Sequence, residues 1–403
     1  MTRATDPYSD VRYTEADTAK SLRVLHIITH LDIGGAENMA MTLIEALGDD
    51  VDFSVFAVLR RAVPNAIGHD MADRLARRGV TCRFGVGGRF KSGGVVVAAW
   101  ALVRAVAEQR PDVIHVHTET PETTLAVACL MSRRVRTVPL VRTVHNATLW
   151  IGWTGLGRWV TQRLAHGVAV AVSRHAAQAD AAIRTRTPRP PATIVYNGVV
   201  VPPPVPPDRA PGPVRLLFAG RLVHQKGADL LPAILAAAHA RTTRRDVAVV
   251  IAGSGVLHDV VARDLEARLP GWDVTLTDPI ARLSDRFAEY DIVLVPSRFE
   301  GFGLLVVEAL LAGLPVVTTT APGLDEVVPR DYPFMADPGD VAALGGHLAR
   351  MIDDPAGARR IAATCRPDLA ARFGSDGMAS AYLGRYRALA RCRAFSRCRA
   401  FSR

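Results

Sequence analysis

One segment of this sequence, residues 291–310, constrains the fold more than any other. Residues 291–295 form a short apolar run of the kind that is buried in a parallel sheet. A loop with Gly301 and Gly303 follows, and residues 304–310 are predicted to open a helix. The unpaired N–H groups at the start of such a helix, together with the positive end of its dipole, favour a bound phosphate.

Two glutamates bracket this loop. Glu300 precedes the glycines and Glu308 lies eight residues later on the predicted helix, so both carboxylates can face one bound molecule. Carboxylates would repel a diphosphate, but they accept hydrogen bonds from hydroxyls. A ligand with phosphates in its middle and hydroxyls at both ends is a nucleotide sugar. The segment therefore predicts a nucleotide-sugar site.

Apolar strands and helical stretches alternate in both halves of the chain, which predicts an α/β protein with two doubly wound parallel sheets. The first domain is expected over residues 22–205 and the second over residues 214–375. The proline-rich residues 206–213 between them are interpreted as a stiff linker.

The two ends of the chain give weaker signals. Residues 1–21 are expected to be flexible, and residues 376–391 form a predicted helix that can pack back on the first domain. Residues 392–403 are an immediate duplication of six residues, and we expect them to be disordered.

Composition narrows the class of protein. The 403 residues are 49% hydrophobic, and the longest apolar candidate, residues 95–106, contains Arg104 and is too short to span a bilayer. Residues 1–20 lack a secretion signal, so a cytoplasmic location is expected. The net charge of +10 suits an anionic acceptor, an anionic membrane surface or simply a solvated surface. Few aromatic residues lie among the basic ones, which argues against nucleic acid. Five cysteines argue against a disulfide framework.

Two further loops follow predicted strands. Gly34 and Gly35 come after the first strand, where they allow a diphosphate or acceptor to approach, although an ordinary tight turn has the same pattern. The loop after residues 214–218 contains Gly220, Arg221 and Lys226. Both cations could reach a diphosphate, and Lys226 is one of only three lysines in the chain. A solvated basic loop is the alternative.

Histidines mark the strand ends of the first half. His145 ends a strand and could bind a sugar, or could simply be a half-buried histidine. His115 and His117 point to one face of a strand, but no third metal ligand is evident, so a structural or acceptor-side role is favoured. Glu119 is a candidate acceptor contact. Three tryptophans after His145 could stack on a sugar, insert at a membrane or pack: Trp150, Trp153 and Trp159.

Together these motifs resemble the retaining glycosyltransferases of family GT4, over roughly residues 22–390. The resemblance implies the GT-B fold, in which two Rossmann-like domains face each other across a cleft. The most specific matches are the segment from Glu300 to Glu308 and the loop from Gly220 to Gly227. The remaining matches are residues 34–37, 143–145, 197–199 and 253–255.

The resemblance implies roles for individual residues. Arg221 and Lys226 would hold the donor diphosphate, Glu308 the ribose and Glu300 the hydroxyls of the transferred sugar. His145 would contact the sugar from the first domain. The other donor-binding positions are Gly34, Gly35, Gly220, Gly303, Leu304, Leu305 and Val306, and the acceptor-side candidates are His117 and Glu119. No metal or other cofactor is implied.

The expected activity is a hexosyltransferase that moves a hexose or N-acetylhexosamine to an acceptor hydroxyl. The acceptor would belong to polysaccharide, glycolipid or natural-product biosynthesis, with the inner face of the cell membrane as a second location. Pro322-Gly323 and residues 277–280 depart from the family pattern, and the latter leave the base open, with UDP favoured and GDP second. A GT-B epimerase and a non-catalytic nucleotide-sugar-binding protein are the alternatives.

Overall fold

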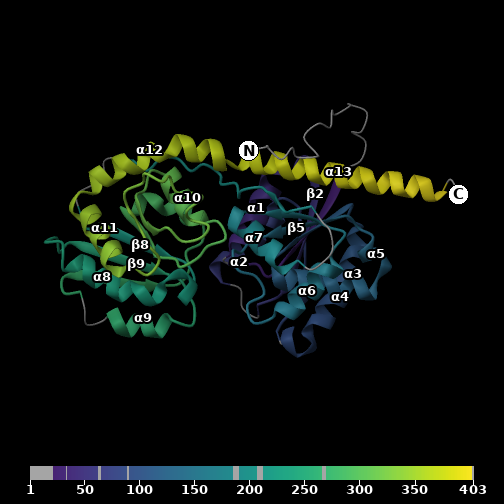
Figure 1. Cartoon of the computed structure of the whole chain (residues 1–403), viewed down its shortest axis with the longest axis horizontal. Coiled ribbons are helices and arrows are strands. Elements are labelled where there is room, and N and C mark those ends of the chain that lie inside the picture. Colours follow the sequence, from purple (N-terminus) through teal and green to yellow (C-terminus); the bar gives the residue numbers. More distant parts are fainter. Residues whose placement is uncertain are drawn as a thin grey trace. The chain divides into compact units, whose positions relative to one another are not determined.

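A computed structural model describes residues 21–32, 34–61, 65–88, 90–184, 190–206, 212–265 and 269–401, and only the backbone of residues 393–401. Residues 1–20 and most of the expected linker, residues 207–211, lie outside this part of the chain. The chain divides into two compact units (Figure 1). Unit 1 comprises Met1–Gly198 and Ser375–Arg403, and unit 2 comprises Val199–Gly374.

Unit 1 contains a parallel sheet of seven strands in the order β3-β2-β1-β4-β5-β6-β7. The strands are β1 (Leu22–Ile28), β2 (Val51–Leu59), β3 (Thr81–Val86), β4 (Val113–His117), β5 (Leu140–Val144), β6 (Val168–Ala171) and β7 (Thr193–Ile194). The helices are α1 (Gly35–Leu47), α2 (Ala66–Arg77), α3 (Val95–Gln109) with a π-helical lead-in (Phe90–Gly94), α4 (Glu119–Met131), α5 (Arg133–Arg136), α6 (Thr154–Arg163), α7 (Arg174–Ile183) and α13 (Ser375–Phe401).

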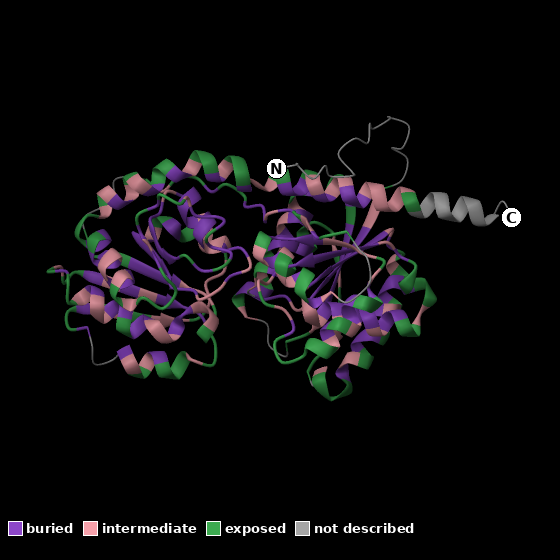
Figure 2. Ribbon diagram, in the orientation of Figure 1, coloured by how far each residue is buried: buried purple, intermediate pink, exposed green. Residues whose placement is uncertain are grey.

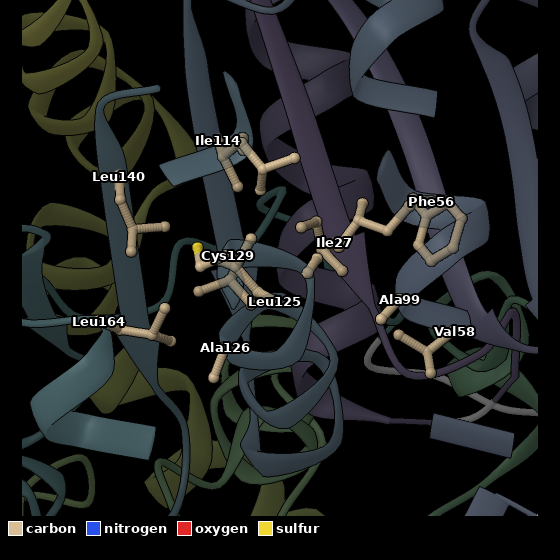
Figure 3. Close-up of a cluster of buried hydrophobic side chains, with 14 of the residues drawn as sticks. Ile27, Phe56, Val58, Ala99, Ile114, Leu125, Ala126, Cys129, Leu140 and Leu164 are labelled. Atoms are coloured by element: carbon tan, nitrogen blue, oxygen red, sulfur yellow. The ribbon is translucent and has the colours of Figure 1, made fainter. Parts of the chain in front are cut away.

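The core of unit 1 lies between one face of this sheet and helices α3 and α4. Ile27, Phe56 and Ile114 from three strands pack with Ala99 and Leu125 from the two helices (Figure 3). Both faces of β4 and β5 are fully buried, which is why their sequences read as continuous apolar runs interrupted only by residues with polar partners.

Unit 2 contains a parallel sheet of six strands in the order β10-β9-β8-β11-β12-β13. The strands are β8 (Val214–Ala219), β9 (Val247–Ala252), β10 (Trp272–Thr277), β11 (Ile292–Val295), β12 (Val316–Thr319) and β13 (Met335–Ala336). The helices are η3 (His224–Lys226), η4 (Ala228–Leu230), α8 (Leu231–His239), α9 (His258–Leu265), η5 (Leu283–Glu289), α10 (Leu304–Leu311), α11 (Val341–Asp353) and α12 (Pro355–Phe373). Figure 2 shows the buried strands of each unit in purple.

The first domain ends earlier than the sequence predicts. Residues 199–205, expected in the first domain, belong to unit 2. The Val205 amide donates to the Ala312 carbonyl at 2.8 Å, and Arg366 Nη2 donates to the Pro202 carbonyl at 3.0 Å. These bonds attach the start of the proline-rich stretch to unit 2, a contact that composition does not reveal.

The last helix belongs to unit 1 and is longer than expected. Tyr382 and Tyr386 of α13 are fully buried there. The helix is assigned to Phe401, ten residues beyond its predicted end at residue 391. Extending an existing helix is far easier than starting one, and the alanines and arginines of the repeat favour this extension.

Helix α3 and its lead-in also differ from the sequence prediction. By length and composition alone, Phe90–Gln109 is the single helix in the described part of the chain that could cross a membrane, although residues 95–106 had looked too short. Ala98, Ala99 and Leu102 are buried in the core of unit 1, so one side of the helix packs on the sheet. Its outer side carries exposed apolar residues.

Candidate functional site

The predicted donor residues of unit 2 lie at the carboxyl ends of neighbouring strands. Lys226 follows β8 and Glu300 follows β11, and these two strands pair in parallel. Lys226 Nζ donates to both carboxylate oxygens of Glu300, at 2.6 and 2.7 Å, and Ser297 Oγ donates to Oε1 at 2.8 Å. The expected phosphate-binding cation and the expected sugar-binding carboxylate therefore form one ion pair.

A glycine lets the two loops approach closely enough for this ion pair. Gly227 has a φ of 67°, and a Cβ there would collide with the carbonyl oxygen of Pro296. Gly323 has a φ of 91° and lies against the carbonyl of Glu300, whose amide donates to Pro322 at 2.9 Å. The Pro322-Gly323 pair, a departure from the family pattern, thus supports the glutamate loop directly.

Arg298 braces the same loops, a role that the sequence did not reveal. Its guanidinium donates to both carboxylate oxygens of Asp229 at 2.7 and 2.8 Å, and to the carbonyl of His224 at 2.8 Å. This bidentate contact ties the loop after β11 to η3 and η4. Arg221 is exposed and donates to Gln225 Oε1 at 2.9 Å, so its guanidinium remains accessible to a ligand.

Helix α10 begins beside Glu300 without a side-chain cap. Gly303, in the left-handed region with a φ of 90°, is its N-cap and offers no side-chain acceptor. The amides of Leu304 and Leu305 in the first turn have no intrahelical acceptor. The Val306 amide already donates to the Gly303 carbonyl at 3.0 Å, so the expectation that it caps a phosphate is not supported.

Glu308 completes the candidate donor site. Its side chain is half-buried, and no hydrogen bond to its carboxyl occurs within the described residues. Desolvation raises the pKa of this carboxyl to about 7. A carboxyl that is partly removed from water without a partner costs stability, and hydroxyl donors from a ligand would satisfy it.

Four buried histidines dominate the candidate site of unit 1. His145 Nε2 lies 3.0 Å from His117 Nδ1, and His117 Nε2 lies 2.9 Å from His26 Nδ1. Burial lowers the pKa of His26 and of His145 to about 3 and that of His115 and His117 well below its ordinary value. All four imidazoles are therefore neutral near pH 7.

Residues from two further elements extend this cluster. His115 Nδ1 lies 2.6 Å from the hydroxyl of Tyr386, and His115 Nε2 lies 2.7 Å from Thr143 Oγ1. Thr143 Oγ1 lies 2.9 Å from the hydroxyl of Tyr382. The two tyrosines come from α13, more than two hundred residues away in sequence, so no local pattern could have identified them.

His26 is the third histidine that the metal hypothesis lacked. It lies in register with His115 on the neighbouring strand β1, and nitrogens of His26, His115 and His117 lie within 4.8 Å of one another. Every ring nitrogen of these three residues already has a hydrogen-bond partner, the longest contact being 3.5 Å between His26 Nε2 and Tyr386. The arrangement is that of a hydrogen-bonded cluster.

The acceptor-side candidates separate in the structure. His117 is fully buried with both nitrogens engaged, so direct contact with an acceptor is not supported. Glu119 is half-buried at the start of α4 and accepts a long hydrogen bond from Asn146 Nδ2 at 3.4 Å. It follows Thr118, whose φ of 64° is strained for a β-branched residue.

The glycine pair of unit 1 has a packing role. Gly34 is extended, and a Cβ there would collide with the Glu37 carboxylate. Glu37 is buried in the first turn of α1, where the backbone of Thr29 and His30 hydrogen-bonds its carboxylate. Gly34 therefore makes room for Glu37, whatever else it contacts. Gly35 is the first residue of α1.

Comparisons with known proteins agree with both units. The family "Glycosyltransferase Family 4" matches residues 33–201, and "Glycosyl transferases group 1" matches residues 213–354. A 2-deoxystreptamine glucosyltransferase of Streptomyces kanamyceticus is 30% identical over 72% of this chain and 82% of its own length. A glycogen synthase of Mycobacterium tuberculosis is 29% identical over 69% of each chain.

Solved structures agree on the fold. The Anabaena protein Alr3699/HepE, in complex with UDP and glucose, superimposes with a TM-score of 0.70 at 20% identity, covering 90% of this chain and 98% of its own. Sucrose-phosphate synthase from Thermosynechococcus elongatus has a TM-score of 0.68 at 18% identity, with coverage of 91% and 99%. The chain therefore belongs to glycosyltransferase family 4 and has the GT-B fold, as the motifs predicted.

Proposed function

We propose that this protein is a retaining, metal-independent glycosyltransferase. It moves a hexose or N-acetylhexosamine from a nucleotide-diphosphate sugar, with UDP favoured over GDP, to an acceptor hydroxyl. The Lys226–Glu300 pair carries the proposal, because it joins a cation for the leaving diphosphate to an acceptor for sugar hydroxyls. The UDP-glucose complex of a structural neighbour supports a UDP-sugar donor.

Lys226 can serve both partners at once. An ammonium has three N–H donors, and two of them point to the Glu300 carboxylate, which leaves one for a phosphate oxygen. The lysine is a quarter exposed, so a ligand can reach it. Glu300 in turn keeps lone pairs for the hydroxyls of the sugar.

The proposed reaction needs charge stabilisation above all. The bond between the anomeric carbon and the diphosphate oxygen breaks, and the acceptor oxygen attacks the same face of the sugar while its proton passes to the departing phosphate. Lys226, Arg221 and the amides of Leu304 and Leu305 would stabilise the negative charge that develops there, in place of a divalent cation. Glu308 would accept hydrogen bonds from the ribose.

Assays of donor turnover in EDTA test this function. With a panel of UDP- and GDP-sugars, we expect slow release of UDP from one donor without added metal. Glu300→Ala should abolish that release, while Glu289→Ala should not, since Glu289 forms a surface pair with Arg286 in the same unit. A new nucleotide sugar without nucleotide release would indicate the epimerase. Donor binding without turnover on any acceptor would indicate a non-catalytic binding protein.

The names of relatives guide the proposal for the acceptor. Relatives named for 2-deoxystreptamine, D-inositol 3-phosphate and glycogen span small and polymeric acceptors. We therefore propose a hydroxyl acceptor in polysaccharide, glycolipid or natural-product biosynthesis, with His145 and Glu119 on the side of unit 1 that receives it. The proposed location is cytoplasmic.

We further propose that unit 1 contacts an anionic lipid surface through its "α3 face", defined as Lys91, Val96, Val97, Trp100, Arg104 and Trp153. The two valines and two tryptophans are each more than half exposed. Arg104 lies over the ring of Trp100 at 4.9 Å, and Lys91 lies over that of Trp153 at 5.8 Å. Exposed tryptophans beside cations suit the boundary between lipid headgroups and acyl chains.

The other tryptophans near His145 have different surroundings. Trp150 is buried against Gly157, and Trp159 is half-buried against the core. Of the three roles that the sequence left open, packing fits these two residues. Of the three tryptophans, only Trp153 is exposed enough to contact a lipid surface.

Vesicle flotation tests the α3 face. We expect salt-sensitive flotation with vesicles of phosphatidylcholine and phosphatidylglycerol, and none with phosphatidylcholine alone. Trp100→Asp should abolish flotation and leave turnover of a soluble acceptor unchanged. Val256→Asp, an equally polar change at a residue of unit 2 that is 87% exposed, is the control. Absence of binding by the unmodified protein would exclude this contact.

A further inference from the structure

The buried histidines belong to one continuous series of hydrogen-bonding groups. It runs from His145 through His117 and His26 to Tyr386, then through His115 and Thr143 to Tyr382. All seven side chains lie in unit 1, and all except His145 are fully buried. We call this series the histidine chain.

The tautomers of its members are mutually dependent. A neutral imidazole has one N–H donor and one bare nitrogen, and each hydrogen bond contains a single hydrogen. If His117 donates to His145 from Nδ1, its Nε2 must accept from His26, which then also carries its hydrogen on Nδ1. Reversing one bond reverses the other. His145, His117 and His26 must therefore all share the same tautomer.

The inner end of the chain selects between the two directions. Within the described residues, the only hydrogen-bond partner of the Tyr382 hydroxyl is Thr143 Oγ1. If hydrogens point inward from His145, Thr143 donates to Tyr382, and the buried Tyr382 hydrogen has no acceptor. If they point outward, Tyr382 donates to Thr143, and the hydrogen left over lies on Nδ1 of His145, the one member of the chain that is not fully buried. An unpaired buried donor costs stability, so the outward direction is favoured.

The outward direction assigns every other hydrogen. Thr143 donates to His115 Nε2, and His115 donates from Nδ1 to the Tyr386 oxygen. The Tyr386 hydroxyl then points to His26 Nε2 at 3.5 Å, the weakest contact of the chain. With hydrogens pointing inward in the outer part and outward in the inner part, the Tyr386 oxygen would accept from both His115 and His26, and the buried Tyr386 hydrogen would have no acceptor within the described residues.

We propose that the histidine chain holds His145 in its Nδ1–H tautomer, so that the nitrogen facing away from His117 is a fixed hydrogen-bond donor. His145 Nδ1 has no hydrogen-bond partner within the described residues. His145 would therefore donate to a sugar or acceptor oxygen and would not act as a base. This use of His145 rests on the proposed function, whereas the tautomer itself does not.

In this proposal His117 is a positioning residue. It donates a hydrogen bond to His145 Nε2. This nitrogen must then be the bare one, so the hydrogen of the neutral His145 ring lies on Nδ1. The neighbours His26, Tyr386, His115, Thr143 and Tyr382 act only through His117. The arrangement explains why a polar series is buried in the sheet of unit 1: each member satisfies the next.

Nitrogen NMR of the intact protein with 15N-labelled histidine tests the tautomers directly. Four of the twelve histidines should carry their hydrogen on Nδ1 and should not titrate between pH 5.5 and about 8, since burial keeps them neutral. Nε2–H tautomers at His145 and His117 would overturn the proposal. So would a bound metal ion on His26, His115 and His117, detected by elemental analysis of the purified protein.

Two substitutions at His117 separate positioning from simple packing. In His117→Gln, the amide nitrogen can donate to His145 and the amide oxygen can accept from His26, so the Nδ1–H tautomer of His145 should persist. His117→Leu can do neither, and His145 should shift to Nε2–H. We expect kcat/KM to fall about tenfold in His117→Leu, with KM for the donor little changed, and to stay within about threefold in His117→Gln. Equal losses in both variants would contradict a positioning role.

Tyr386→Phe is a milder change that tests the direction of the chain. With hydrogens pointing outward, only the His115 N–H loses its acceptor, so the His115 signal should change while that of His145 should not. With hydrogens pointing inward, the His26 N–H would lose its acceptor and the signals of His26, His117 and His145 would change together. The NMR results stand whether or not the protein transfers a sugar, so failure of the proposed function would be seen separately.

Discussion

Replacing Lys226 with alanine should lower the rate of donor turnover about 10²–10³-fold. The lysine is the cation nearest to Glu300, at 2.6 Å, and it would face the negative charge that develops on the departing diphosphate. Removing one preorganised donor to such a charge costs about that much in enzymes of several classes. The measurement is nucleotide release at saturating donor. The control is Lys91→Ala, which removes a lysine of unit 1 that lies over the ring of Trp153. This substitution should leave nucleotide release unchanged.

The same substitution also removes the partner of a buried carboxylate, which complicates its interpretation. Glu300 would keep only its bond from Ser297, and an unpaired buried charge destabilises a fold strongly. The double variant Lys226→Ala, Glu300→Gln removes that charge and should recover thermal stability without recovering turnover. Recovery of both would mean that Lys226 acts on the fold alone.

Acidification from pH 7 to pH 5 should destabilise unit 1 strongly. The buried histidines His26, His115, His117 and His145 have lowered pKa values, so they bind protons in the unfolded chain near pH 6.5 but not in the folded one. Stability is then lost as the pH falls below about 6.5, by about 2 kcal/mol per histidine at pH 5.

Two carboxyls of unit 1 oppose this effect. Burial raises the pKa of Glu37, and that of Glu122 to about 7, so the folded state takes up protons there as the pH falls. Glu122 offsets about one histidine and Glu37 acts in the same direction, which leaves a net loss of less than about 6 kcal/mol. In unit 2, burial lowers the pKa of His347 and raises that of the Glu308 carboxyl to about 7. These two shifts have opposite effects on stability as the pH falls, so unit 2 should share little of the loss.

Urea unfolding at pH 7 and pH 5 measures the difference. His26→Phe removes one titrating group and should reduce the pH dependence by about 2 kcal/mol, whatever it does to stability at pH 7. His258→Gln is the control, because His258 is about half exposed on unit 2 and pairs with Asp259. Equal unfolding midpoints for the unmodified protein at both pH values would contradict burial of four neutral histidines.

The strand, loop and helix from β11 to α10 were predictable because their signals are local. The apolar run of β11, the left-handed Gly303 and the helix of α10 are adjacent in sequence, and each follows from the conformational range of a few residues. The pairing of Lys226 with Glu300 was not predictable. These residues are 74 positions apart, and their contact depends on β8 and β11 being neighbours in the sheet.

The histidines show the opposite case. The sequence placed His115 and His117 on one face of a strand but supplied no partner for them. Their partners come from β1, β5 and α13, and the identity of each partner depends on sheet order and on where the last helix packs. His26 has no local signal beyond its place in a strand.

The sequence by itself determined the family of this protein, the α/β architecture of both units and the strand, loop and helix around Glu300, because periodicity, glycine positions and motif spacing are properties of short segments. Only the tertiary structure decided which polar groups are buried together. It placed residues 199–205 in unit 2 and the Glu37 carboxylate against Gly34. It also showed that the Val306 amide donates to the Gly303 carbonyl, and that four histidines share one hydrogen-bonded series with two tyrosines of α13. The physical reason is that burial and hydrogen-bond partners arise from contacts between segments distant in sequence, which no single segment encodes.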